Sequence, residues 1–165
     1  MLSLEGEGWR LVLDPERQPY AVLIGGADWA AELQLEEALA LMRGLHRLQV
    51  QHAALADGLM AEEAISLELE TPITPEQAAA PGAGLSGAGV LWLELVGDRQ
   101  RWSLRFVLTP EVAVRGVEGG WSELAAPAFA AALAAALPEA LPQLCRGRSG
   151  VAHETGGVAV SDQQC

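Results

Sequence analysis

The chain has 165 residues, which is enough for one domain with a proper hydrophobic core. Its net charge of −12 comes from 22 acidic residues against 10 basic ones, all of them arginine, and this argues against nonspecific coating of nucleic acid because an acidic surface repels phosphate. The two cysteines, Cys145 and Cys165, make no disulfide framework, and the acidic N-terminus does not resemble a signal peptide, so we expect a soluble cytoplasmic protein.

The first part of the chain predicts three strands. Trp9, Leu11 and Leu13 alternate with other residues at the period of two that is typical of a half-buried strand. A second strand is predicted over 20–24, ended by Gly25 and Gly26, and a short third one over 29–33.

From Leu35 to about Met60 the pattern changes to a long amphipathic helix. One side follows a spacing of four and three residues, through Leu41, Leu45, Leu48, His52, Leu55 and Leu59. His52 in this seam is either a ligand or proton switch, or a core histidine with one ring nitrogen bonded to a backbone carbonyl; we favour the core histidine.

Alternation over 65–70 predicts a strand with a solvated acidic face, and residues 71–89, rich in Pro, Ala and Gly, predict a mobile loop. Inside that loop, residues 82–87 fit the dinucleotide pattern GxGxxG. The motif works only where the glycines follow a strand and open a helix. Here they precede a strand, so we take the match as compositional.

Residues 90–96 and 101–108 predict a hairpin around residues 97–100. Its inward face carries Leu91, Leu93, Leu95, Trp102, Leu104, Phe106 and Leu108, and its outward face carries Trp92, Glu94, Arg101, Ser103 and Arg105. In the simplest register Trp92 lies opposite Arg105, and Val96 opposite Arg101.

A further strand is predicted over 112–118, followed by a helix from about Pro127 to Leu137 with Phe129 and Leu133 on its apolar stripe. We expect Pro138 and Pro142 to end this helix. The most apolar run, from Ala125 to Leu137, is interrupted by Pro127 and is shorter than the roughly 20 residues that a membrane span needs. Beyond Leu144 the chain is polar and Gly-rich, so residues 144–165 are expected to be a disordered tail.

The two ends of the chain echo each other. Gly25, Gly26 and Trp29 recur as Gly119, Gly120 and Trp121, and Gly6 and Trp9 recur as Gly97 and Trp102. We interpret this as an internal duplication of a strands-then-helix unit, with unit 1 over about 1–60 and unit 2 over about 65–137, inside one domain of residues 1–143. Strands followed by helices predict an α+β fold in which two helices pack on antiparallel sheets, and the two copies predict a pseudo-symmetric pair within a monomer. Both glycine pairs are expected to be turns from strand into helix, with Trp29 and Trp121 in the core.

Six segments stand in a distinctive order and spacing. They are Glu5–Leu11, Gly25–Leu33, Leu59–Glu63, Leu91–Leu95, Ser103–Arg105 and Glu118–Trp121. Together, over roughly residues 4–137, they resemble an uncharacterised cyanobacterial family of unknown function. The resemblance implies a Whirly-like fold, similar to the single-stranded-DNA-binding transcriptional regulators of the Whirly and positive-cofactor-four type. It carries over no activity, cofactor or site residue.

The candidate binding residues are Trp92, Arg99, Arg101 and Arg105. Trp92 has no counterpart in the other half and lies on the predicted outer face, and single-strand binders combine aromatic platforms with positive charge. The alternative is that Arg101 and Arg105 pair with Glu94 and cover Trp92.

The sequence contains no GxSxG, HExxH or Walker motif, so we expect no enzyme, catalytic residue, metal or cofactor. The favoured interpretation is a protein-binding or regulatory module with an unidentified protein partner. The alternative is single-stranded nucleic-acid binding through the face that carries Trp92.

Overall fold

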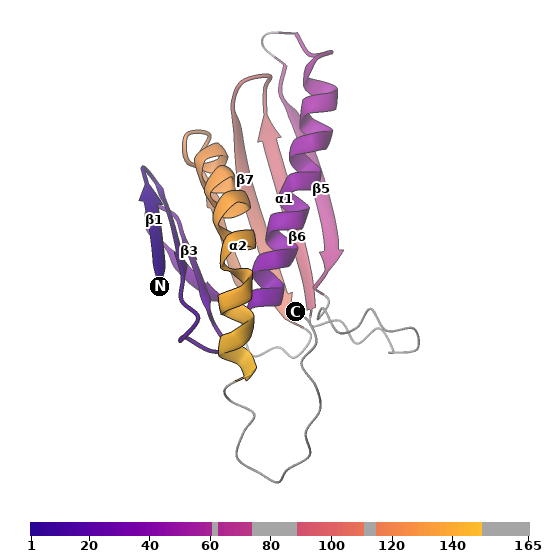
Figure 1. The fold of residues 1–165 in the computed structure, drawn as a ribbon. Helices are drawn as coiled ribbons and strands as arrows, with labels where there is room; N and C mark the ends of the chain where they lie inside the picture. Colours follow the sequence, from indigo (N-terminus) through magenta and orange to yellow (C-terminus); the bar gives the residue numbers. More distant parts are fainter. Residues whose placement is uncertain (61–62, 74–88, 111–114, 150–165) are drawn as a thin grey trace.

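Each half of the chain folds as four antiparallel strands followed by one helix (Figure 1). The computed structural model describes residues 1–60, 63–73, 89–110 and 115–149, and the side chains of these residues up to Arg146. The first half contains β1 (Leu2–Gly6), β2 (Trp9–Leu13), β3 (Val22–Gly25), β4 (Ala30–Leu33) and α1 (Leu35–Ala56). The second contains β5 (Ile65–Pro72), β6 (Gly89–Gly97), β7 (Trp102–Pro110), β8 (Val117–Trp121) and α2 (Ala125–Ser149). The predicted α+β fold with a repeated strands-then-helix layout is confirmed.

Each helix packs mainly on the sheet of the other half. Helix α1 lies over β5 and β6, while α2 lies over β2 and reaches β7, and the two helices are side by side (Figure 1). Gly44 allows the close approach of α1, because a Cβ there would lie 2.5 Å from Leu93 Cδ1 on β6. Neither half therefore closes its own core, and the two halves depend on each other for folding.

Helix α1 begins where its sequence predicts and ends earlier. The Gln34 side chain caps the helix, and the Glu37 carboxylate accepts the Gln34 backbone N–H at 2.7 Å, forming a capping box. The predicted seam is buried through His52, whereas Leu55 is 52% exposed and the helix ends at Ala56 rather than near Met60. The His52 prediction is confirmed as to burial, but its Nε2 atom has no hydrogen-bond partner among the described residues.

Two tryptophans join the halves by reciprocal hydrogen bonds. Trp29 Nε1 donates to the Gly120 carbonyl at 3.2 Å, and Trp121 Nε1 donates to the Gly25 carbonyl at 2.8 Å. Their rings are 5.1 Å apart and continue into a cluster with Phe106 and Phe129. The prediction of a core position is confirmed for Trp121, whereas Trp29 is partly buried and packs against the core. The echoed stretches meet at the junction of the two sheets.

The predicted role of the glycine pairs is wrong. Gly25 ends β3 and Gly26 opens the turn into β4, whereas Gly119 and Gly120 lie inside β8. Neither pair leads from a strand into a helix. Strand β8 also begins later than the predicted strand over 112–118, of which residues 112–114 are outside the described ranges. The layout repeats, but the echoed residues occupy different positions in it.

The hairpin of β6 and β7 has the predicted faces and a different register. All seven predicted inward residues are buried. Trp92 lies opposite Val107 rather than Arg105, and Val96 opposite Ser103 rather than Arg101. The register shifts by two because Asp98 Oδ1 accepts the backbone N–H groups of Gln100 and Arg101, which places Arg101 in the turn.

Helix α2 continues through both prolines to Ser149, so the predictions of an end near Leu137 and of a tail from residue 144 are wrong for these residues. Pro138 and Pro142 are exposed, where water can satisfy the freed carbonyls. The buried stripe through Leu133 and Leu137 extends to Leu144, whose carbonyl accepts a bond from the Gln18 amide at 3.4 Å. The remaining tail and residues 74–88 of the predicted loop lie outside the described residues.

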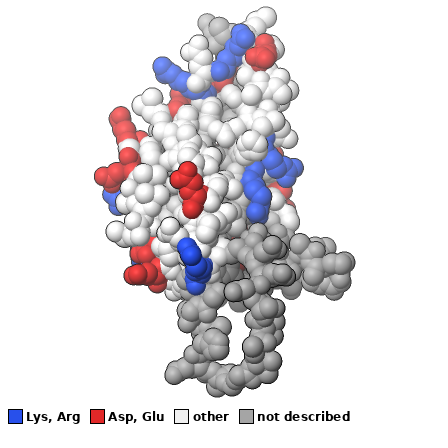
Figure 2. All heavy atoms as spheres, in the orientation of Figure 1, with Lys and Arg blue, Asp and Glu red and all other residues white. Residues whose placement is uncertain are grey.

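By length and composition, residues 125–146 of α2 satisfy the criteria for a membrane-spanning helix. In the fold, however, the helix buries Phe129, Leu133 and Leu137 against the sheets, and a core helix of a soluble protein meets the same criteria. The helix side of the molecule is largely uncharged, with most arginines and acidic residues toward its rim (Figure 2). Helix α2 thus packs one face on the sheets, and 33% of its apolar stretch is buried.

Candidate functional site

The structure separates the four predicted binding residues. Trp92 is half-buried on the outward face of β6. Arg105 lies diagonally across from it on β7, two residues before Val107, which is directly opposite Trp92. Arg99 and Arg101 lie in the turn that follows β6. The last residue of that strand, Gly97, is already about 17 Å along the strand from Trp92, at ~3.4 Å per residue. Only Arg105 is therefore brought near Trp92.

The β6–β7 turn is fixed by its own carboxylate. Asp98 Oδ1 accepts hydrogen bonds from the backbone N–H of Gln100 at 2.7 Å and from that of Arg101 at 2.8 Å. These bonds hold the pKa of Asp98 below its usual 3.8. Asp98 also offsets the charge of the two neighbouring arginines, so the turn is a weak site for phosphate.

The outward face around Trp92 is acidic. Glu70 and Val107 flank Trp92 across the strands, and Arg105 Nη1 lies 3.7 Å from Glu94 Oε2. Glu68, opposite Glu94, and Glu118, opposite Val107, lie on the same face. Together with Glu70 and Glu94 they make four carboxylates around one arginine, Arg105. The alternative in which Arg105 pairs with Glu94 is thus realised, and Arg101 takes no part in it.

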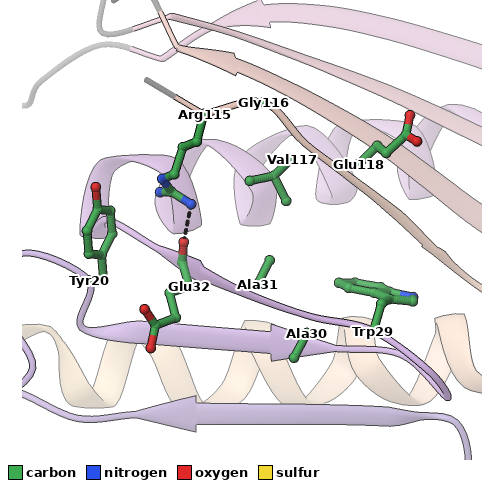
Figure 3. A pocket seen from close by; sticks show the side chains of 9 residues that line it. All are labelled: Tyr20, Trp29, Ala30, Ala31, Glu32, Arg115, Gly116, Val117 and Glu118. Carbon is green, nitrogen blue, oxygen red and sulfur yellow. Dashed lines mark hydrogen bonds between the residues drawn. The ribbon is translucent and has the colours of Figure 1, made fainter. Parts of the chain in front are cut away.

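A cleft of about 630 Å³ separates β4 from β8, the inner edge strands of the two sheets (Figure 3). Its volume falls in the range of roughly 300–1,000 Å³ that is usual for binding sites. The residues that line it are Tyr20, Trp29, Ala30, Ala31, Glu32, Arg115, Gly116, Val117 and Glu118. Among the described residues no backbone hydrogen bond joins the two strands.

Side chains bridge the cleft at both ends. At one end Arg115 Nη1 donates to the Glu32 carbonyl at 2.5 Å, as the dashed line in Figure 3 marks. At the other end Trp29 donates to the Gly120 carbonyl. The edge strands are therefore held beside each other in antiparallel directions without forming one continuous sheet.

The middle of each edge offers backbone groups to the cleft. In an antiparallel ladder the N–H and C=O of alternate residues point to the same side of the strand. The Glu32 and Gly120 carbonyls point into the cleft, because they accept the two bridging bonds. By alternation, Ala30 on β4 and Glu118 on β8 also turn their N–H and C=O groups toward it. The cleft thus contains donors and acceptors on both walls.

Arg115 is anchored by contacts outside the cleft. Its Nη2 donates to Glu37 Oε2 at 2.9 Å, and its guanidinium carbon lies 4.4 Å from the centre of the Tyr20 ring. The side chain is only 26% exposed and that of Glu37 only 6%. With its donors engaged and its charge balanced by Glu37, Arg115 is better suited to holding the cleft than to binding an anion.

The described residues that line the cleft include no Ser, Cys, His or Lys side chain. Among the described residues no three His, Cys, Asp or Glu side chains are grouped to hold a metal. A second hollow, of about 330 Å³, lies beyond Trp29 and Ala30 and is lined by Arg10 and Asp28. Arg10 pairs with Glu5 at 3.6 Å, and Asp28 has no ion pair within the described part of the chain.

Sequence reasoning did not identify the cleft. The sequence pattern places Trp29 in the core and gives Arg115 no role. The bond from Arg115 to Glu32 spans 83 positions and the bond from Trp29 to Gly120 spans 91. The repeat of glycine pair and tryptophan is the sequence feature that could have indicated the cleft. Its two copies bond to each other across the junction of the halves, through Trp29 and Trp121.

Comparisons with known proteins give a family without an activity. A model of a domain of unknown function, DUF1818, matches residues 4–79. No curated protein matches the chain. A solved structure of a protein of unknown function from the cyanobacterium Prochlorococcus sp. NATL2A, described as from the DUF155 family, is 30% identical, with a TM-score of 0.66 over 81% of this chain and 96% of that chain. At this identity and coverage, the chain belongs to the same family of unknown function as the Prochlorococcus protein.

Proposed function

We propose that the protein is a non-enzymatic protein-binding module that accepts an extended segment of a partner protein between β4 and β8. One observation carries the proposal: the two edge strands line a cleft, share no backbone hydrogen bond among the described residues, and direct backbone groups of Ala30 and Glu118 into it. Addition of a strand to a free sheet edge is a common way of binding peptides, since main-chain hydrogen bonds supply affinity.

The whole-chain charge agrees with a protein partner. A net charge of −12 repels phosphate and attracts basic protein segments. Side chains rather than backbone bonds close the ends of the cleft, so an added strand would displace the Arg115 and Trp29 bridges but leave the hydrogen-bonded ladders of both sheets intact.

Binding of single-stranded nucleic acid through the Trp92 face is the alternative. The implied likeness to Whirly-type regulators and the half-exposed indole beside Arg105 favour it. The four carboxylates on the same face weigh against it, because each neutralised phosphate requires a cation. We therefore place this function second.

A displayed library of random heptapeptides, selected against the full-length protein, tests the proposal. We expect enriched peptides to bind with micromolar affinity in calorimetry and to shift the amide resonances of Ala30, Glu32, Glu118 and Gly120. N-methylation of alternate peptide nitrogens should weaken binding at least tenfold, because each lost N–H leaves a strand carbonyl unpaired. Enriched peptides that shift resonances around Trp92 instead, or that tolerate N-methylation throughout, would show that strand addition is not the mode.

Titration with fluorescent single-stranded DNA and RNA at increasing salt tests the alternative. Measurable binding at low salt that Trp92→Ala with Arg105→Ala abolishes would support the nucleic-acid function. We expect no binding, or binding that this double variant leaves unchanged.

A further inference from the structure

We infer that the partner segment is an extended basic peptide whose solvent-facing side chains are Lys or Arg and whose inward side chains are small and apolar. The inference rests on the proposed function and concerns the same cleft. It follows from the side chains on the cleft walls, whereas the proposed function follows from the backbone.

The inward side of the cleft is apolar and shallow. Ala31 lies opposite the buried Ile24 and Val117 lies opposite the buried Leu108, so both side chains point toward the core. Both pack against that core. A residue inserted between them meets a methyl group on one side and an isopropyl group on the other, which fits alanine or valine better than a large or polar side chain.

The outward side carries negative charge. Glu32 and Glu118 alternate with the inward residues and thus flank the outward positions of an added strand. Glu32 is paired with Arg17, whereas Glu118 is exposed and has no ion pair among the described residues. The one cation that lines the cleft, Arg115, is already held by Glu37. An incoming strand therefore meets an unbalanced carboxylate and, among the described residues that line the cleft, no available positive charge.

A cross-strand pair of opposite charges stabilises adjacent strands, and a pair of like charges destabilises them. A basic residue beside Glu118 satisfies this rule, and an acidic one violates it. The alternation of the cleft thus predicts a peptide of alternating basic and small apolar residues.

Three end-blocked hexapeptides that alternate valine with lysine, glutamine or glutamate test the inference by calorimetry on the full-length protein. We expect the lysine peptide to bind about fivefold more tightly than the glutamine peptide in 50 mM salt, and the glutamate peptide to bind most weakly. Glu118→Gln should bring the ratio of lysine to glutamine peptide close to one. Glu68→Gln, which removes an exposed carboxylate of the same sheet outside the cleft, should leave that ratio unchanged and controls for the general acidity of the protein.

Equal affinity for all three peptides, or a ratio that Glu118→Gln does not alter, would overturn the basic-partner inference and leave strand addition standing. Tighter binding of the glutamate peptide would also overturn it and would indicate Arg115 as the recognising group. Failure of all three peptides to bind, together with failure of the heptapeptide selection, would overturn the proposed function as well.

Discussion

Replacement of Arg115 by alanine should strongly destabilise the protein, although the residue lies at the rim of a surface cleft. Arg115 donates to Glu37 Oε2 at 2.9 Å and to the Glu32 carbonyl at 2.5 Å. Glu37 is buried in the first turn of α1, and both hydrogen-bond partners of Arg115, Glu32 and Glu37, belong to the other half of the chain. Loss of Arg115 leaves the buried Glu37 carboxylate without its cation and removes one of the two bridges across the cleft.

The expected loss follows from the burial of the pair. Breaking a fully buried ion pair costs about 3–5 kcal/mol. Arg115 is 26% exposed, and Glu37 keeps the Gln34 backbone N–H, so we expect a smaller loss of about 2–3 kcal/mol. For a domain of this size that loss lowers Tm by roughly 5–10 °C. Arg105→Ala is the matched control, because Arg105 is 72% exposed at 3.7 Å from Glu94, and it should cost about 0–0.5 kcal/mol.

Guanidinium denaturation of the two alanine variants measures both quantities, and Glu37→Gln completes a double-mutant cycle with Arg115→Ala. The loss on removing Arg115 should shrink when residue 37 is already neutral, because the uncompensated charge is then absent. A loss below about 1 kcal/mol for Arg115→Ala, or additive losses in the cycle, would refute the reasoning.

Three further predictions follow from local geometry. Gly119→Ala places a Cβ 2.8 Å from Trp29 Cζ2, so we expect a loss of about 1–3 kcal/mol in chemical denaturation. Pro138→Ala restores a helical N–H in an exposed position of α2, so we expect a gain of about 1–3 kcal/mol and a higher Tm. The pKa of Asp98 is lowered in the folded state, above all by the backbone N–H of Gln100. The stability that ionised Asp98 contributes is therefore present above pH 3.8 and is lost as the pH falls through the lower folded pKa. The difference in unfolding free energy between wild type and Asp98→Ala should accordingly shrink below pH 3.8.

Each of these variants has a control or a contradicting result. Gly58→Ala should change stability by less than about 0.5 kcal/mol, since the nearest atom to a Cβ there is the Leu55 carbonyl oxygen at 3.6 Å. Pro127→Ala, in the first turn of α2, should give no gain because that N–H has no intrahelical partner. A Pro138→Ala variant that is less stable than wild type would mean that the packing of Leu144 requires the proline. A stability difference for Asp98→Ala that persists undiminished at pH 2 would contradict the role of its charge.

Periodicity predicted the faces of the sheets but not their alignment. The inward leucines of β6 and Trp102, Leu104 and Phe106 of β7 were identified because burial imposes a period of two regardless of register. The register itself depended on one side chain, Asp98, whose two bonds move Arg101 out of the strand. This shift of two positions places Val107 opposite Trp92 and moves Arg105 to the diagonal position, opposite Glu94.

Local rules failed where tertiary packing outweighed them. Proline disfavours a helix interior by about 3 kcal/mol, yet α2 continues past Pro138 because Leu144 still has a buried place to occupy. The glycine pairs suggested turns into helices, whereas Gly119 is a strand residue that leaves room for the Trp29 ring. The cleft could not be predicted at all, since its walls come from halves that contact each other only through long-range packing.

The reciprocal tryptophan bonds, together with the packing of each helix on the sheet of the other half, explain why β4 and β8 share no backbone hydrogen bond in the described part of the chain. Exposed edges tend to aggregate unless something prevents pairing. Here Arg115 and Trp29 occupy one carbonyl on each edge, and the packing of each helix on the opposite sheet fixes the distance between the sheets. Closing the cleft into one continuous sheet would require moving whole helices, because each helix is packed on the sheet of the other half.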